Sequence, residues 1–163
     1  TTCTEDLTTE EEAWNVILDL SQDIGHKLRA NDLSACGVQI AVRDSGLAWK
    51  QYQAPLDAPS MSSYELAVKA RSLFDENYTW RMPVRSLTVR AINLISNNLP
   101  CQLELFGDYD RRKRREKLEK AVDRIRSVYG SGSVIPAVLL AGHKMPGIGE
   151  NDPRMPSVMY QIQ

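Results

Sequence analysis

Residues 38–53 read VQIAVRDSGLAWKQYQ, and this pattern predicts two paired strands. Apolar side chains occupy every second position of 38–43, which is the period of a strand with one buried face. The Asp-Ser-Gly sequence at 44–46 is typical of a hairpin turn, so we expect a second strand over 47–53. Two prolines are expected to end that second strand: Pro55 and Pro59.

Two helices are predicted on either side of this hairpin. Thr9 and Glu12 have the spacing of a capping box, and the apolar periodicity behind them predicts a helix over 10–30. Ser62 and Glu65 repeat the same signature at the start of a second helix. The apolar stripe of this second helix comprises Leu66, Ala67, Ala70, Leu73 and Phe74.

A third helix is predicted over 111–129, and Gly130 lies where a helix commonly ends. The five consecutive cations at 111–115 are most simply a solvated helix start. Cations are unfavourable there, however, which points to compensating partners: phosphate, or the nearby acids Asp108, Asp110 and Glu116. We expect this helix to have an apolar face. That face comprises Leu118, Ala121, Val122, Ile125, Val128 and Tyr129.

Two further strands complete the predicted fold. Residues 84–95 alternate as 38–43 do, and 133–140 predict a short last strand despite Pro136. The order of elements predicts an α+β fold, in which helices pack on one face of a small, mostly antiparallel sheet. The other sheet face would be polar and basic, as suits an anionic partner. It would carry Gln39, Arg43, Lys50, Ser86, Thr88 and Arg90.

The composition of the 163 residues is that of a globular domain, with 42% hydrophobic and 25% charged residues. The net charge of −1 conceals an asymmetry: residues 1–80 carry 6 Lys and Arg against 13 Asp and Glu, whereas residues 81–163 carry 14 against 8. Such a split favours one surface for an anionic partner and another that repels it. Three widely spaced cysteines favour a reduced, cytoplasmic setting, and no apolar run has the length of a membrane span.

The sequence shows no catalytic constellation and no metal-binding motif. His26 lies within the first predicted helix and His143 near the C-terminus, so neither forms a pair with a nucleophile. Asp108 and Asp110 are best explained as acids at a helix start, where the macrodipole favours them. We therefore predict a binding domain with no cofactor of its own.

Residues 102–106 read QLELF and form the most specific short motif of the chain. They resemble the peptide by which many bacterial replication proteins dock on the sliding clamp. The amide of Gln102 can hydrogen-bond in a polar pocket, while Leu103, Leu105 and Phe106 can anchor in an adjacent apolar cleft. The alternative is that these three apolar side chains form a buried edge strand beneath helix 111–129.

The stretches ENYTW at 76–80, PVRSLTVR at 83–90 and NL at 93–94 precede this motif. In this order they resemble the last strand of the C-terminal little-finger domain of Y-family translesion DNA polymerases, in the DinB/UmuC (ImpB–MucB–SamB) group. The resemblance covers about residues 1–143. It implies a DNA-repair role, in which the domain grips the primer–template duplex without sequence preference and tethers the polymerase to the sliding clamp.

Carried over residue by residue, the resemblance implies DNA contacts from the paired strands and the long strand. These contacts are Arg43, Lys50, Gln51, Arg85, Ser86, Thr88 and Arg90. The resemblance also implies that the catalytic carboxylates and their Mg²⁺ ions belong to palm and fingers domains missing here, so that the fragment binds DNA and does not copy it. The rival prediction is a free-standing α+β nucleic-acid-binding or regulatory module with no polymerase attached.

The predicted organisation has four parts. They are a little-finger domain over 1–100 with its first strand truncated to Thr1 and Thr2, a clamp-binding loop over 101–109, an additional helix and short strand over 110–143, and a flexible tail over 144–163. Because the chain starts with Thr and not Met, we expect it to be a piece of a longer protein.

Overall fold

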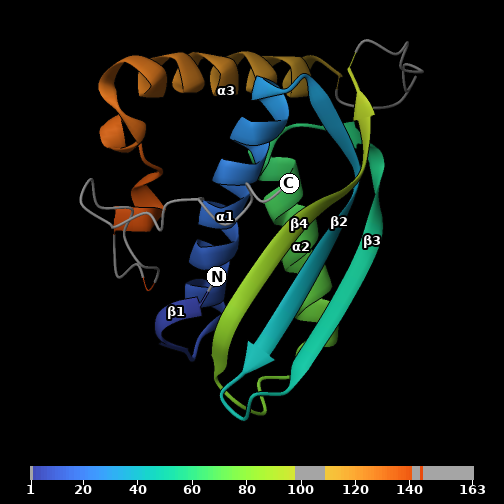
Figure 1. The fold of residues 1–163 in the computed structure, drawn as a ribbon, viewed down its shortest axis with the longest axis vertical. Coiled ribbons are helices and arrows are strands. Elements are labelled where there is room, and N and C mark those ends of the chain that lie inside the picture. The colour runs from blue at the N-terminus through green and yellow to red at the C-terminus, as the bar shows by residue number, and fades with distance from the viewer. Residues whose placement is uncertain (1, 98–108, 141–143, 145–163) are drawn as a thin grey trace, which may run out of the picture.

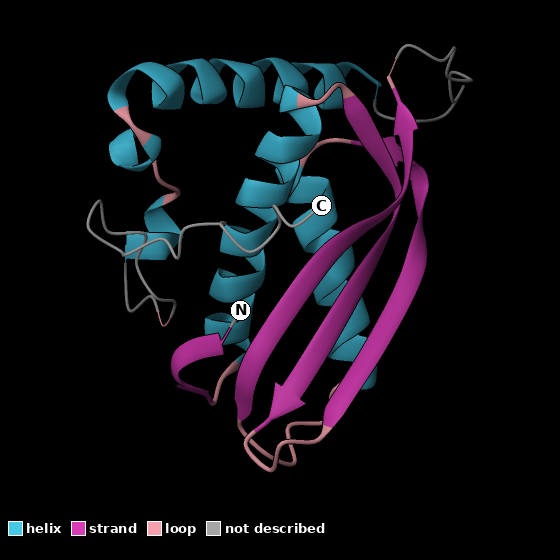
Figure 2. Ribbon diagram, in the orientation of Figure 1, coloured by secondary structure: helices cyan, strands magenta, loops and turns pink. Residues whose placement is uncertain are grey.

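The computed structural model describes residues 2–97, 109–140 and 144 (Figure 1). The elements, in chain order, are β1 (Thr2–Leu7), α1 (Glu10–Ala30), β2 (Leu33–Asp44), β3 (Trp49–Ser60), α2 (Ser63–Asn77), β4 (Val84–Ser96) and α3 (Tyr109–Tyr129), followed by 3-10 turns at Ser131–Ser133 and Ala137–Leu140. The strands form one antiparallel sheet in the order β1-β4-β2-β3. Helices α1 and α2 pack together against one face of this sheet (Figure 2), which confirms the predicted α+β fold.

Helix α1 begins as its sequence predicts. The Thr9 hydroxyl accepts a hydrogen bond from the Glu12 N–H at 3.2 Å, and the Glu12 carboxylate accepts one from the Thr9 N–H at 3.3 Å. These two bonds satisfy backbone donors that a helix leaves unpaired in its first turn. Further along α1, Gly25 lies against the start of α2, where a Cβ atom would collide with Ser63. The helix therefore starts at a defined residue and can approach α2 closely.

The core lies between the two helices and the sheet. Val38, Ile40 and Val42 of β2 have exposed fractions of 2% or less, and Leu87 of β4 and Phe74 of α2 are buried beside them. Full burial of one such side chain contributes about 1.5–3 kcal/mol to the free energy of unfolding. The inward positions predicted for the first strand of the hairpin are therefore confirmed, but the strand is not half-buried, because Gln39 and Ala41 between them are buried too.

Strand β3 is longer than predicted, because it continues through both prolines to Ser60. Pro55 and Pro59 are tolerated because β3 is an edge strand, in which one row of backbone N–H groups has no partner strand to bond. The register with β2 shifts between Ala35 and Gly37, so the pairing is interrupted near Pro55 and resumes at Ser60.

Two other strand predictions need correction. The first strand extends beyond Thr1 and Thr2, because β1 runs to Leu7 and pairs with β4. The short strand predicted over 133–140 is wrong, because 3-10 turns form there instead. Pro136 has no N–H for a strand ladder, and its carbonyl accepts a hydrogen bond from the Leu139 N–H at 2.9 Å, which closes a turn.

Lys144 lies at the start of the predicted flexible tail, but it is fixed against β1. Its carbonyl accepts a hydrogen bond from the Thr4 N–H at 3.0 Å, and its ammonium lies 2.7 Å from a carboxylate oxygen of Glu12. Burial raises the pKa of Glu12, but hydrogen bonds from Lys144 and the α1 cap outweigh burial and lower that pKa overall. The rest of the predicted tail lies outside the described residues.

The capping box predicted at Ser62 and Glu65 is wrong, because α3 provides the cap of α2. The Ser62 hydroxyl donates a hydrogen bond to Glu119 of α3 at 2.9 Å, and the Ser63 N–H donates one to the same carboxylate at 3.2 Å. Glu65 instead accepts two hydrogen bonds from Arg112, at 3.1 and 3.0 Å. The basic run at the start of α3 therefore finds one of its partners in Glu65 of α2, an acid that the sequence did not predict as a partner.

Arg29 at the end of α1 is the centre of the contact with α3. Its side chain is 5% exposed and donates hydrogen bonds to Glu119 at 2.6 Å, to Asp123 at 2.5 and 3.1 Å, and to the Met61 carbonyl at 3.0 Å. The Nδ1 atom of the His26 ring also lies 3.1 Å from a carboxylate oxygen of Asp123. α3 thus crosses the ends of α1 and α2 (Figure 1) and is held by charged groups, while most of its predicted apolar face is exposed.

The substitution Asp123→Asn tests this ionic contact. Burial raises the pKa of Asp123, but the bonds from Arg29 and His26 outweigh burial and hold that pKa below its ordinary value. Removing the charge leaves a buried guanidinium partly unpaired, at a cost of up to about 3 kcal/mol. We expect hydrogen exchange of the α3 amides to become at least about 10-fold faster.

The matched control is Asp75→Asn, which removes the carboxylate of the exposed pair with Arg71 and should change exchange little. In the unsubstituted chain, the stability that Asp123 contributes is fully present above its unfolded-state pKa. That stability is lost as the pH falls from there through the lowered folded-state pKa. Exchange of α3 that does not respond to Asp123→Asn would contradict the ionic contact.

Candidate nucleic-acid interface

The sheet face opposite α1 and α2 is formed by alternate residues of β2, β3 and β4. The strand register aligns these residues in three rows that run across the sheet. The rows are Arg90–Gln39–Gln53, Thr88–Ala41–Gln51 and Ser86–Arg43–Trp49. We call these nine residues the open face. The two arginines come from different strands, so the positive charge is spread over the surface.

A chain of hydrogen bonds organises the first row of the open face. Gln39 donates its amide N–H to Gln53 at 3.2 Å and accepts a bond from the Arg90 guanidinium at 3.5 Å. Gln39 is only 9% exposed, so these bonds satisfy an amide that would otherwise be buried without partners. Arg90 and Gln53 are themselves exposed and can still offer donors to a ligand.

Exposed donors continue along the other two rows. Gln51 and Arg43 are exposed, and Trp49 beside Arg43 is 51% exposed. Guanidinium and amide donors suit the oxygens of phosphate groups, and an exposed indole can stack on a base or pack on a sugar. The open face can therefore bind a polyanion that also presents flat or apolar surface.

Most of the DNA contacts predicted from the sequence lie together on the open face. They are Arg43, Gln51, Ser86, Thr88 and Arg90. The sequence prediction did not assign Gln53 and Trp49 to this surface. A signal for them was present, because residues two positions from Gln51 on the same strand must share its face.

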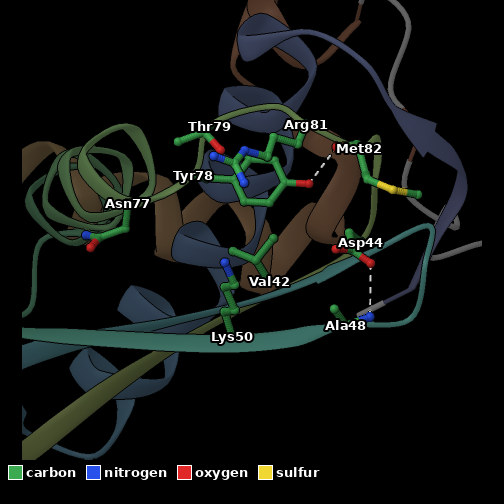
Figure 3. A pocket seen from close by; sticks show the side chains of 9 residues that line it. All are labelled: Val42, Asp44, Ala48, Lys50, Asn77, Tyr78, Thr79, Arg81 and Met82. Carbon is green, nitrogen blue, oxygen red and sulfur yellow. Dashed lines mark hydrogen bonds between the residues drawn. The ribbon is translucent and has the colours of Figure 1, made fainter.

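Lys50 was predicted to lie on the polar face, but it lies on the opposite one. It pairs with Val42, whose side chain points toward the helices, whereas its neighbour Gln51 pairs with Ala41 on the open face. Lys50 lines a pocket of about 180 Å³ with Tyr78 and other residues (Figure 3). Lys50 and Gln51 are adjacent in a strand and cannot share a face.

The pocket beside Lys50 mixes charges of both signs. Lys50 and Arg81 line it together with Asp44, whose carboxylate accepts a hydrogen bond from the Ala48 N–H at 2.9 Å (Figure 3). Burial, with a smaller contribution from Asp44, raises the pKa of Tyr78, whose hydroxyl donates to the Met82 carbonyl. This mixture does not favour an anion over a cation.

Arg85 lies at the margin of the candidate interface. The pairing of β4 with β2 shifts at this residue, because Ser86 pairs with Arg43 while Val84 pairs with Asp44. The Arg85 guanidinium lies 3.1 Å from a carboxylate oxygen of Asp6 in β1, and its side chain is 45% exposed. Its charge is therefore partly neutralised within the protein.

The other predicted sites can be described only in part. Gln102, Leu103, Leu105 and Phe106 lie outside the described residues. Within the described ranges, no group of three or more His, Cys, Asp and Glu side chains could hold a metal ion. Among the helices described, each is too short or too polar to cross a bilayer.

Comparison with known proteins identifies the family. Residues 1–105 match the model of the impB/mucB/samB family C-terminal domain, and the chain therefore belongs to this family. A DNA polymerase IV of Acetivibrio thermocellus is 35% identical over 139 residues, which cover 85% of this chain and 35% of that protein. A DNA polymerase IV of Desulfatibacillum aliphaticivorans is 29% identical over 132 residues, which cover 81% and 33%.

The chain thus spans about a third of the length of these relatives. A solved structure described as a complex of the β-clamp processivity factor and the little finger domain of PolIV is also similar, with a TM-score of 0.46 and 19% sequence identity. The similarity covers 66% of this chain and 95% of that one. The resemblance drawn from residues 76–94 is confirmed by the family match.

Proposed function

We propose that this chain is the DNA-gripping domain of an error-prone DNA polymerase that copies past lesions. Its open face would hold the primer–template duplex. Family membership and the naming of the relatives as DNA polymerase IV support this proposal. The observation that carries it is the alignment of Arg43, Arg90 and the amides of Gln51 and Gln53 on the sheet face opposite the helices.

The chemistry of these side chains suits phosphate contacts. Guanidinium groups and amides donate hydrogen bonds to phosphate oxygens, which are the same along every DNA sequence. Such contacts give affinity without sequence information, as an enzyme that must move along any template requires. Trp49 would add apolar contact at one end of the face.

The distribution of acidic residues supports the same orientation. Glu10 and Glu11 lie in the first turn of α1, on the helix side of the sheet. Their negative charge would repel DNA from that side, while Arg43 and Arg90 would attract it to the open face. The near-neutral net charge of the chain is therefore compatible with a DNA-binding surface.

The double substitution Arg43→Ala with Arg90→Ala tests the open face. Each arginine would neutralise about one phosphate, so the slope of log K against log salt should flatten by about 2. Duplex affinity at low salt should fall by at least about 10-fold, because hydrogen bonds to charged groups are lost. Fluorescence anisotropy with a labelled primer–template duplex at several salt concentrations measures both quantities.

Lys50→Ala is the matched control, since it removes one cation from the opposite face of the same sheet. It should leave the slope nearly unchanged. A slope that flattens for Lys50→Ala and not for the double variant would place the duplex on the other side of the sheet. Arg85 remains a proposed marginal contact, which would have to exchange Asp6 for phosphate.

We also propose that residues 102–106 tether the polymerase to the sliding clamp. The support is chemical: one amide and three large apolar side chains in the order QLELF can fill a polar pocket and an adjacent cleft. Clamp contact and duplex contact would then come from separate segments of one chain.

Leu105→Ala with Phe106→Ala should lower clamp affinity by at least about 30-fold, since two anchor side chains are removed. The matched control is Glu104→Ala, which alters the variable position between the anchors and should retain binding. Surface plasmon resonance on an immobilised bacterial clamp provides the affinities, and circular dichroism verifies the fold. Clamp binding by the double variant would contradict this role, and so would unfolding, which would favour the buried-strand alternative.

The proposed enzyme would carry out its chemistry elsewhere in its sequence. We propose that its catalytic carboxylates and Mg²⁺ ions lie in the part of the relatives' length that this chain does not match. The domain would act in the cytoplasm, where bacterial DNA is found. Its contribution to catalysis would be to hold the duplex and so to position the primer end.

A further inference from the structure

Helix α3 turns its charged side toward the rest of the protein. Arg29, Ser62 and Ser63 bind Glu119 and Asp123, as described above. Arg115 adds a contact on the same side, with its guanidinium 4.2 Å from the centre of the Tyr64 ring. Since ionic and cation–π contacts hold the helix, its apolar residues are not needed for docking.

Those apolar residues face away from the docked side. Leu118 is 64% exposed, Ile125 is 42% exposed and Val128 is 72% exposed, and Ala121 between them is exposed too. We call these four residues the apolar stripe. Their spacing of three, four and three residues is that of the seam along which two helices pack in a coiled coil.

The apolar stripe differs from scattered surface hydrophobics. Single exposed apolar side chains are normal on a soluble protein. Here they recur on one line of a helix over about 15 Å, and Tyr129, which is 76% exposed, adjoins the end of that line. A continuous apolar line of this kind indicates an interaction surface.

The charges beside the stripe indicate what kind of partner fits. Three exposed cations lie among or next to its residues: Arg114, Lys117 and Arg124. The acidic residues in the same part of α3 are engaged, because Glu119 and Asp123 bind Arg29 and Glu116 pairs with Lys120 at 2.6 Å. The outward surface is therefore apolar along its centre and positive at its margins.

We propose that the apolar stripe docks an amphipathic helix of a partner protein whose apolar residues are flanked by Asp and Glu. Apolar side chains of the partner would fill the spaces along Leu118 to Val128, and its acids would pair with Lys117 and Arg124. A second copy of this chain fits poorly, since it would bring like cations together. This contact would be independent of the open face and of residues 102–106.

Three synthetic helical peptides of equal length test the proposal. The first has Leu at the seam positions and Glu at the flanking positions, the second has Leu and Lys, and the third has Ser and Glu. The first should bind the full chain, measured by fluorescence anisotropy, and the other two should bind at least about 10-fold more weakly. The third peptide separates docking from simple attraction of an acidic peptide to a basic surface.

The variant Leu118→Ser with Ile125→Ser should lower the affinity for the first peptide by at least about 10-fold. Leu140→Ser is the matched control, because Leu140 is 72% exposed and lies outside the stripe. Hydrogen exchange of α3 and affinity for the duplex should be unchanged in both variants, since the docked side and the open face are untouched.

Two results would overturn the proposal. One is a first peptide that binds no better than the others, or equally well to the stripe variant. The other is a concentration-dependent dimer of the unsubstituted chain in analytical ultracentrifugation that the stripe variant does not form, which would assign the stripe to a second copy. Peptide binding to the apolar stripe does not depend on whether the Arg43 and Arg90 variant loses duplex binding, so the two proposals are tested separately.

Discussion

The alternation of side chains along β2 is the constraint on which both faces of the sheet depend. β2 is hydrogen-bonded to β3 on one side and to β4 on the other. The faces to which its side chains alternate therefore determine which side chains of β3 and β4 share each face. Val38 and Val42 point toward the helices, and Gln39 and Arg43 point away. A slip of one residue would bury an arginine and expose the core, so the hydrophobic effect that folds the domain also aims its cations outward.

Charge has two different uses in this chain. On the open face it is exposed and spread over two strands, where it can meet phosphates. At the ends of α1 and α2 it is enclosed, since Arg29 joins α1 to both Glu119 and Asp123 of α3. A buried ion pair gives directional specificity at a desolvation cost, and here it determines which side of α3 turns inward. This orientation of α3 leaves the apolar stripe exposed to solvent.

The sequence predicted the elements whose signals are local, and α1 with its Thr9 cap is the clearest case. The sequence did not predict features that depend on a distant contact. Ser62 is an example, because its cap comes from a helix more than fifty residues away. The length of β3 was not predicted, because a proline such as Pro55 would end a central strand but is tolerated in an edge strand. Which strand lies at the edge depends on contacts between distant parts of the chain. The face of Lys50, in contrast, could have been predicted from alternation alone.

The central claim is that the open face holds duplex DNA. Its most direct test is a titration of the isotope-labelled chain with a primer–template duplex, followed by amide chemical shifts in NMR spectra. We expect the largest changes on β2, β3 and β4 around Ala41, Gln51 and Thr88, with α1 and α2 little affected. Changes confined to α3 or to the helix side of the sheet would contradict it.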